Sequence, residues 1–564
     1  MIRSLILWLT LALLVGCTAI PTAGPVEEVP HSAEPGGIDI APEPPAEGVP
    51  PVRLVEGFLQ AMAVPEGDYA IARDYLTEEA AADWGPDGEI TIYEGVVAGN
   101  AEGAAISGMQ VATLDEAGRY TAQDLPYQHD FGLVRVDGQW RIGSPPPGLI
   151  LSRYLFERYY ARLTLYFMSR IGSHVVPDPI YAHETLATPT AVVEGLLGGP
   201  PSSLARVVTN ALPDGASLGS DGATIDTRGV VTVDLTGLDG DMPDDARRRL
   251  GAQLLWSLTS LPRVTGLVIT RDDVTFTLPG ATAAGVLELA AQQGYQVLSR
   301  ASTIDLFGVR ESVPGRIPGV GGFERWQGVE LPAADLAVSL DGSSVALIEE
   351  RRGDVALGPL TGELSPVRVG LLNLRLPQYS LGSLWVLGDN VGGTPTLAIV
   401  DRTGQVAPVS LDLPQGARIH EFAVSPTRAR VALVLQVGEE RQLGVATVIG
   451  AEPATVMNWQ RIPALSSSGQ AITDITSVAW QSETGIAFTG SVAGLRSVYT
   501  VQIDGSHLED LGSVTGGIAE LAAMARLGGG AIAVRTPADI AWRYEARTRW
   551  TRLGEGISAI AYGG

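Results

Sequence analysis

Two short patterns in the sequence place reactive side chains at spacings that hydrolases use. Gly215–Gly219 matches G-x-S-x-G, which would make Ser217 a nucleophile. That motif needs a strand before the serine and a helix after it, whereas a polar turn and then a strand follow here, so a turn is the simpler interpretation. His183-Glu184 begins like the zinc-binding pattern H-E-x-x-H, but Ala187 stands where the second histidine is needed. Neither pattern predicts a catalytic site.

The densest acidic cluster is formed by Asp239, Asp241, Asp244 and Asp245. Calcium loops need regularly alternating oxygen ligands, and Pro243 interrupts that alternation. Acidic residues at the start of a helix are also stabilised by the helix dipole, so we interpret the cluster as a helix start, with a metal site as the alternative. The histidines show no ligand spacing; they are residues 31, 129, 174, 183, 420 and 507. We therefore expect no metal, no cofactor and no enzymatic activity.

Three further groups could bind a ligand but have a structural interpretation as well. His129 and Asp130 are candidate active-site residues inside an α+β cone, although their place before an apolar strand favours a turn. Arg247–Arg249 could bind an anionic partner, although a solvated helix face is the simpler interpretation. Five tryptophans lie in apolar segments and fit core positions better than sugar-stacking platforms; they are residues 256, 326, 385, 480 and 542.

Composition excludes several classes of protein. The chain has 564 residues, with 38 basic and 63 acidic side chains and a net charge of −25. Every basic residue is arginine, so a P-loop or a lysine Schiff base is excluded. The acidic balance argues against nucleic acid as a partner. A single cysteine, Cys17, excludes an internal disulfide and a thiolate zinc site. The 68 glycines and 37 prolines indicate many turns and favour β-rich domains.

The N-terminus has the pattern of an export signal followed by an anchor. Residues 1–16 contain Arg3, an apolar run from Leu5 to Val15 and the small Gly16, and the run is too short to span a bilayer. Leu14-Val15-Gly16-Cys17 resembles the bacterial lipobox. The resemblance implies cleavage between Gly16 and Cys17, and a diacylglyceryl group and palmitate on Cys17. It further implies a lipid anchor on the outer face of the cytoplasmic membrane. The lack of a twin arginine favours export by the general secretory route. After Cys17, residues 18–51 hold nine prolines and six acidic residues, which predicts an extended stalk.

Three folded regions follow the stalk. In residues 52–148 two helical patterns precede alternating strands, which predicts an α+β cone of the NTF2-like kind with a second helix over 69–82. In residues 149–300 strands alternate with helices expected to start at Thr188-Pro189, near Pro243 and at Ala281, the last running to Gln293. From residue 331 short β-rich units recur at spacings near 40–50 residues, which predicts a propeller of about five or six blades closed by the final strand; a β-sandwich is the alternative.

The middle region resembles the spore-germination GerMN domain. The matching segments, in order, are 193–200 (VEGLLGGP), 211–215 (ALPDG), 231–235 (VTVDL) and 253–269 (QLLWSLTSLPRVTGLVI). The whole order of signal, stalk, α+β domain, GerMN-like domain and propeller resembles the LpqB lipoprotein family of actinobacteria, as does Val176-Pro177-Asp178-Pro179. The expected division is a signal peptide at 1–16, a lipidated cysteine and stalk at 17–51, an NTF2-like domain at 52–148, a GerMN-like domain at 149–300, a connector at 301–330 and a propeller at 331–564.

The family resemblance also implies a function. It points to a non-enzymatic accessory protein that binds the extracellular domain of a sensor histidine kinase, MtrB of the MtrAB two-component system, and affects the cell envelope and division. A module that binds cell-wall glycan or peptide, with peptidoglycan as its partner, is the second hypothesis. A hydrolase that uses a carboxylate pair in the cone or the propeller is the third.

Overall fold

The computed structural model describes residues 42–271, 274–298, 305–466 and 469–564. Residues 1–16, which were expected to form a signal peptide, and Cys17 lie outside the described residues. Residues 44–564 form one compact unit. No helix within the described ranges is both long enough and apolar enough to cross a bilayer.

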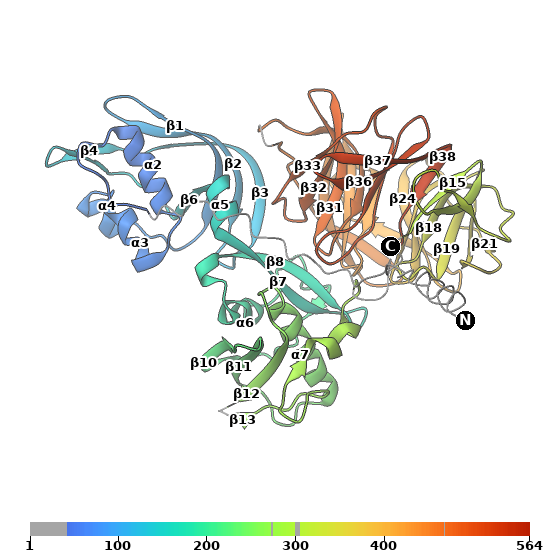
Figure 1. Cartoon of the computed structure of the whole chain (residues 1–564), viewed down its shortest axis with the longest axis horizontal. Helices are drawn as coiled ribbons and strands as arrows, with labels where there is room; N and C mark the ends of the chain where they lie inside the picture. Colours follow the sequence, from blue (N-terminus) through green and yellow to red (C-terminus); the bar gives the residue numbers. More distant parts are fainter. Residues whose placement is uncertain (1–41, 272–273, 299–304, 467–468) are drawn as a thin grey trace, which may run out of the picture. The chain divides into compact units, whose positions relative to one another are not determined.

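The N-terminal domain combines short helices with a curved sheet in the order β3-β2-β1-β6. Its helices are α2 (Pro51–Ala61), α3 (Glu66–Arg73), α4 (Glu78–Asp83) and α5 (Arg153–Tyr159), and its strands are β1 (Ile90–Gly99), β2 (Ala104–Leu114), β3 (Tyr120–Asp130), β4 (Leu133–Val136), β5 (Gln139–Ile142) and β6 (Leu149–Ser152). Figure 1 shows β1–β3 as long, curved strands. This is the expected α+β class, and β6 extends the sheet beyond residue 148.

Helix α2 forms because its apolar residues recur on one face. Leu54, Val55, Phe58 and Leu59 are buried, and Pro51 occupies the first turn, where a missing N–H costs nothing. The single helix expected over 69–82 is wrong. Thr77 Oγ1 accepts a hydrogen bond of 3.1 Å from Ala80 N, and this N-cap starts α4 as a separate helix.

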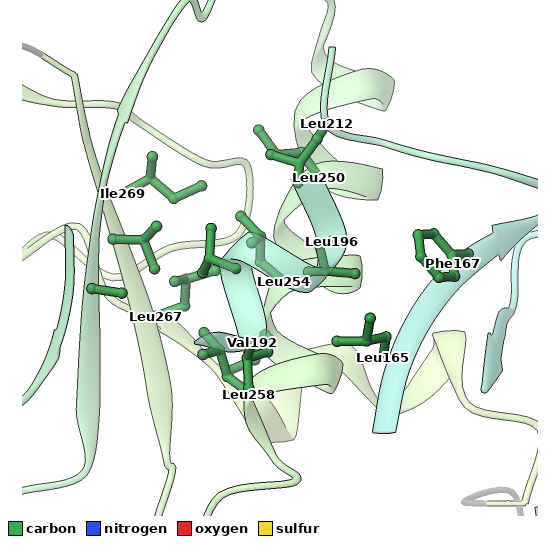
Figure 2. Close-up of a cluster of buried hydrophobic side chains, with 14 of the residues drawn as sticks. Leu165, Phe167, Val192, Leu196, Leu212, Leu250, Leu254, Leu258, Leu267 and Ile269 are labelled. Carbon is green, nitrogen blue, oxygen red and sulfur yellow. The ribbon is translucent and has the colours of Figure 1, made fainter. Parts of the chain in front are cut away.

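The middle domain packs two helices between two sheets. The helices are α6 (Pro189–Leu197) and α7 (Asp244–Leu258), with 3-10 turns at Glu184–Leu186 and Leu289–Tyr295. The sheets are β8-β7-β9 and β10-β11-β12-β13 with β14 beside β12; the strands are β7 (Tyr160–Ser169), β8 (Val175–His183), β9 (Val208–Thr209), β10 (Ser217–Ile225), β11 (Val230–Thr236), β12 (Gly266–Arg271), β13 (Val274–Thr275) and β14 (Leu287–Glu288). Figure 2 shows Leu196 of α6 beside Leu250 and Leu254 of α7, and Leu165 and Phe167 of β7 beyond them.

Two helix starts in this domain were expected correctly and one helix was not. Thr188 Oγ1 accepts from Ala191 N at 3.3 Å and caps α6, and α7 starts directly after Pro243. The helix expected over 281–293 is wrong. Gly285 has a φ of +79°, and Leu287 pairs with Leu267, so the apolar residues of this segment complete a sheet edge instead of a helix face.

The C-terminal region is a propeller of six four-stranded blades, counted over the described residues. From the innermost strand outward the blades are β38-β15-β16-β17, β18–β21, β22–β25, β26–β29, β30–β33 and β34–β37. The strands of the first three are β38 (Ile557–Ala561), β15 (Leu306–Arg310), β16 (Val313–Ile317), β17 (Glu324–Arg325), β18 (Ala333–Val338), β19 (Ser344–Glu349), β20 (Val355–Pro359), β21 (Ser365–Val367), β22 (Leu372–Ser380), β23 (Ser383–Asp389), β24 (Pro395–Val400) and β25 (Val406–Leu411). Those of the last three are β26 (Arg418–Val424), β27 (Arg430–Val437), β28 (Glu440–Ile449), β29 (Ala454–Arg461), β30 (Thr473–Trp480), β31 (Gly485–Val492), β32 (Leu495–Gln502), β33 (Glu509–Gly512), β34 (Glu520–Ala523), β35 (Ile532–Arg535), β36 (Ile540–Ala546) and β37 (Arg549–Glu555).

The last strand of the chain closes the ring. β38 pairs antiparallel with β15, with Gly308 opposite Ile560, as the repeat of the first-strand pattern at the C-terminus predicts (Figure 1). Residues 301–330 were expected to form a connector, but residues 306–325 supply the three outer strands of this blade. These strands were missed because the blade is assembled from both ends of the region, so its repeat is split in the sequence. Closure removes the open sheet edges that a linear array would expose.

Candidate functional site

The candidate catalytic residues of the sequence analysis lie in turns and strands of different domains. His129 Nε2 lies 3.0 Å from Ser144 O, and Asp130 Oδ1 accepts from Gly132 N at 3.0 Å, so both fix the turn after β3. Ser217 lies at the start of β10, where its hydroxyl is 2.7 Å from Thr236 Oγ1, and no helix follows it. The structure brings none of these three side chains together.

The acidic cluster before α7 has the role of a helix start. Asp239 Oδ1 accepts from Asp241 N at 2.9 Å, and Asp244 pairs with Arg247 at 2.8 Å one turn along the helix. Arg249 donates to Thr209 Oγ1 at 3.0 Å. Within the part of the chain that the structure describes, no group of three acidic, histidine or cysteine side chains is arranged to hold a metal ion. Cys17 and Gly16, the expected lipidation and cleavage residues, lie outside that part.

The five tryptophans are core or blade residues. Trp256, Trp385 and Trp480 are at most 5 % exposed, and Trp326 and Trp542 are partly buried. The Trp480 indole donates to Ala423 O of the neighbouring blade at 2.8 Å. Burial of Trp256, Trp385 and Trp480 fits core positions, whereas Trp326 and Trp542 keep part of their surface exposed.

A buried charge pair joins the propeller to the middle domain at Asp178 of β8. Arg430, at the start of β27, donates to Asp178 Oδ1 at 3.2 Å and to Pro177 O at 2.7 Å. Arg119 of the N-terminal domain places Nε 3.6 Å from Asp178 Oδ2. Burial raises the pKa of Asp178, and the charges of Arg430 and Arg119 oppose the rise. All three domains therefore meet at one carboxylate.

Other polar contacts extend this joint. Tyr166 of β7 donates to Glu483 Oε2 at 2.6 Å, and the Tyr181 hydroxyl lies 2.5 Å from Ser506 Oγ. His174 Nε2 is 3.0 Å from Thr427 O. On the propeller, Thr427 and Glu483 lie in the turns after the innermost strands β26 and β30, and Ser506 lies in the turn between β32 and β33. The middle domain thus covers one end of blades β26–β29 and β30–β33.

A second feature is a cavity of about 360 Å³ among the innermost strands, which we call the entrance cavity. Each blade contributes one residue from its innermost strand. These six residues, the entrance ring, are Asp335, Leu376, Glu421, Ser477, Glu520 and Ser558. Around them the cavity is lined by five arginines and by His420; the arginines are residues 352, 375, 441, 496 and 535.

The three carboxyl groups of the entrance ring have raised pKa values. Burial raises the pKa of Asp335 to about 7, and the charge of Glu520 adds to the rise. Burial, Glu520 and Asp335 raise the pKa of Glu421 well above its usual value. Burial also raises the pKa of Glu520, against the effect of its ion pair with Arg535 at 2.7 Å.

The entrance ring was not predicted, although the sequence contains a signal for it. Three of the repeating units begin with an acid at the same place: 335–338 (DLAV), 421–424 (EFAV) and 520–523 (ELAA). Because equivalent residues of a closed ring of blades converge on one axis, an acid at a fixed repeat position predicts a cluster in the channel.

Comparison with known proteins gives the family. A lipoprotein LpqB N-terminal domain model matches residues 44–157, a sporulation and spore germination (Germane) model matches 164–276, and a lipoprotein LpqB β-propeller model matches 314–559. A lipoprotein LpqB of Cutibacterium acnes is 30% identical, over 99% of this chain and 98% of its own length. The chain belongs to the LpqB lipoprotein family. Relatives of the same name in Streptomyces coelicolor and Thermobifida fusca are each 27% identical over 97% of this chain and over 95% and 96% of their own lengths.

Membership of the LpqB family confirms the resemblance to this family and the multidomain fold class. The GerMN-like region corresponds to the Germane domain, and the all-β region is the LpqB propeller. The relatives are named as lipoproteins and not as enzymes, which indicates a membrane-anchored, exported protein.

Proposed function

We propose that this chain is an accessory lipoprotein, anchored through Cys17 on the outer face of the cytoplasmic membrane, that binds the extracellular domain of a sensor histidine kinase of the MtrB kind. The proposal rests on the match to LpqB proteins along nearly the whole chain, and on the lipobox and the acidic, proline-rich stalk of residues 17–51. Two acyl chains anchor a protein stably, and the stalk would hold the folded domains away from the lipid headgroups. Its role is non-enzymatic.

The observation that supports this function best is the joint at Asp178. A carboxylate that pairs with Arg430 and lies beside Arg119 ties three domains into one compact unit. A partner that binds one domain would then be coupled to the other two. An accessory protein alters a kinase only if it binds one signalling state more tightly than the other, and this unit would supply that difference in affinity.

The test uses the lipidated full chain and the resident kinase, reconstituted together in lipid nanodiscs. We expect saturable binding and a change of at least about threefold in kinase autophosphorylation, which corresponds to about 0.65 kcal/mol of preference for one state. The control is the same nanodisc with an unrelated lipoprotein that carries an acidic stalk. Unchanged autophosphorylation at saturating lipoprotein contradicts the proposal.

The second candidate is a module that binds a cell-wall component, with peptidoglycan as the partner. The entrance cavity favours it, because it is concave and its polar groups could fix the orientation of a small ligand. Sedimentation of the chain with purified peptidoglycan separates the two candidates.

A further inference from the structure

Two opposite charges that line the entrance cavity have no ion-pair partner among the described residues. Glu421 has no hydrogen-bond or ion-pair partner there for its carboxylate. Arg352 donates from Nη1 to Leu374 O at 3.1 Å but pairs with no carboxylate. Both side chains are partly buried, and water reaches them through the cavity.

The four other arginines of the cavity and Glu520 are already in ion pairs, and the Asp335 carboxylate accepts hydrogen bonds from Leu336 N at 2.9 Å and Leu376 N at 3.2 Å. Arg375 pairs with Asp389 at 3.2 Å, Arg535 pairs with Glu520, and Arg441 and Arg496 both pair with Asp474. An enclosed charge without a partner is unfavourable, so a ligand that pairs with Glu421 and Arg352 gains more than one that competes for these bridges. A ligand that matches both charges carries one cationic group and one anionic group.

The size of the cavity limits that ligand. A volume of about 360 Å³ lies near the lower end of small-molecule sites, which span roughly 300–1,000 Å³. Ser477 and Thr476 add hydroxyl groups to the wall, and Leu376 and Ala559 add apolar surface. Such a site accommodates one small residue with hydrogen-bonding and apolar parts.

The cavity lies at the end of the channel away from the Germane domain. Each ring residue lies three or four residues before the end of its innermost strand, for example Asp335 in β18 and Glu520 in β34. The Germane domain contacts Thr427 and Glu483, which follow the ends of β26 and β30. The cavity residues lie within the innermost strands, and the residues that contact the Germane domain follow the ends of those strands. Docking of the Germane domain therefore leaves the cavity uncovered.

We propose that the entrance cavity binds an α-amino acid group, in which a protonated amine and a carboxylate share one carbon atom. The amine binds among the carboxylates of the entrance ring, with Glu421 as its main partner. The carboxylate binds Arg352. The group belongs either to a free amino acid or to a residue that a larger molecule presents through its side chain. This site goes beyond the kinase function and does not depend on it.

Calorimetric titration of the lipidated full chain in nanodiscs tests the site. The probes are L-alanine, D-alanine and Nε-acetyl-L-lysine, the last of which presents the α-amino acid group at the end of a long side chain. We expect at least one probe to bind with a Kd in the millimolar range or tighter, and N-acetyl-L-alanine and L-alaninamide to bind at least tenfold more weakly. Tighter binding of Nε-acetyl-L-lysine indicates that the natural ligand is a residue presented through its side chain. Tighter binding of alanine indicates that it is a free amino acid.

Two variants and two matched controls locate the binding. Glu421→Gln and Arg352→Met should each weaken the best probe at least tenfold. The exposed Glu440→Gln and Arg351→Met, which make the same changes outside the cavity, should bind like the original chain. Unfolding temperatures show that each variant is folded. The proposal is overturned if no probe binds at 20 mM, if the blocked analogues bind equally well, or if Glu421→Gln and Arg352→Met bind like the controls. Loss of the kinase effect leaves these results unchanged, so the two proposals fail separately.

Discussion

Arg430 Nη2 lies 3.2 Å from Asp178 Oδ1, and the two side chains are 10 % and 8 % exposed. The pair connects the first residue of a propeller strand to a strand of the Germane domain. Because Arg430 also donates to Pro177 O, the guanidinium is held by two groups of one β-strand. This geometry explains why Pro177-Asp178, noted in the sequence only as a resemblance, is a structural element of the domain joint.

Replacing Arg430 with Met should weaken this joint strongly. Asp178 would keep only the more distant Arg119, and loss of one partner of a buried pair costs about 3–5 kcal/mol. We expect scanning calorimetry to show a lower melting temperature and separate transitions for the propeller and the Germane domain. Arg53→Met removes a 73 % exposed guanidinium from a surface pair and should cost less than about 1 kcal/mol. Equal effects of the two substitutions would contradict a role of Asp178 in coupling the domains.

Replacing Phe58 with Ala should destabilise the N-terminal domain. Phe58 is fully buried on α2, and its ring lies 5.7 Å from Trp84 and 6.2 Å from Phe131. Removal of a buried phenylalanine side chain costs about 3–5 kcal/mol. Urea unfolding followed by tryptophan fluorescence measures the loss. Leu125→Ala, at a site that is 50 % exposed on β3, serves as the control and should change stability little.

Features encoded by a local or repeated sequence pattern were predictable from the single sequence, and contacts between distant residues were not. The helical face of α2 was predictable because Leu54, Val55, Phe58 and Leu59 obey a local period. The ring closure was also predictable, because the last strand repeats the first-strand pattern. The pairing of Asp178 with Arg430 was not, because it joins residues 252 positions apart and no local period encodes such a contact. The helix expected over 281–293 failed for the same reason, since Leu287 pairs with the distant Leu267.

The carboxyl groups of the entrance ring should make stability depend on pH. Asp335, Glu421 and Glu520 have raised pKa values in the folded chain, so the folded state binds more protons than the unfolded state and stability falls as pH rises from about 4 through 7. The groups that face them are Arg352, Arg375, Arg441, Arg496, Arg535 and His420. Burial lowers the pKa of His420, which acts in the opposite direction below about pH 6.5.

Comparison with Glu421→Gln isolates one carboxyl group, because the histidine contribution is common to both proteins. Glutamine does not ionise, so the variant should gain stability relative to the original chain as pH rises from 5 to 8, by at most about 1.4 kcal/mol per pH unit. Melting temperatures at a series of pH values give this difference. Glu440→Gln should follow the original chain throughout. If Glu421→Gln instead loses stability relative to the original chain as pH rises, the raised pKa of Glu421 is contradicted.

Replacing Cys17 with Ser should abolish lipid attachment. The thiol is the group that the lipobox resemblance assigns to the diacylglyceryl chain, and serine offers none. Mass spectrometry of the N-terminal peptide should show a lipid-modified residue 17 in the original chain and an unmodified, uncleaved N-terminus in the variant. Ala19→Ser, two positions later, should leave modification and cleavage intact. Lipid on the Cys17→Ser chain would refute the assignment.

Replacing Gly308 with Ala should loosen the closure of the propeller. A Cβ at Gly308 would lie 2.8 Å from Ala559 O and 3.0 Å from Ile317 Cδ1, closer than packed atoms allow, so β15 must move away from β38. We expect faster hydrogen exchange of the amides of Ile557–Ala561 and a lower melting temperature of the propeller, because the last strand is the only part of the described chain that pairs with β15 on its inner side. Gly319→Ala is the matched control, since a Cβ there meets no atom within 4 Å. If exchange in β38 rises equally in both variants, or in neither, the strand does not close the ring through this contact.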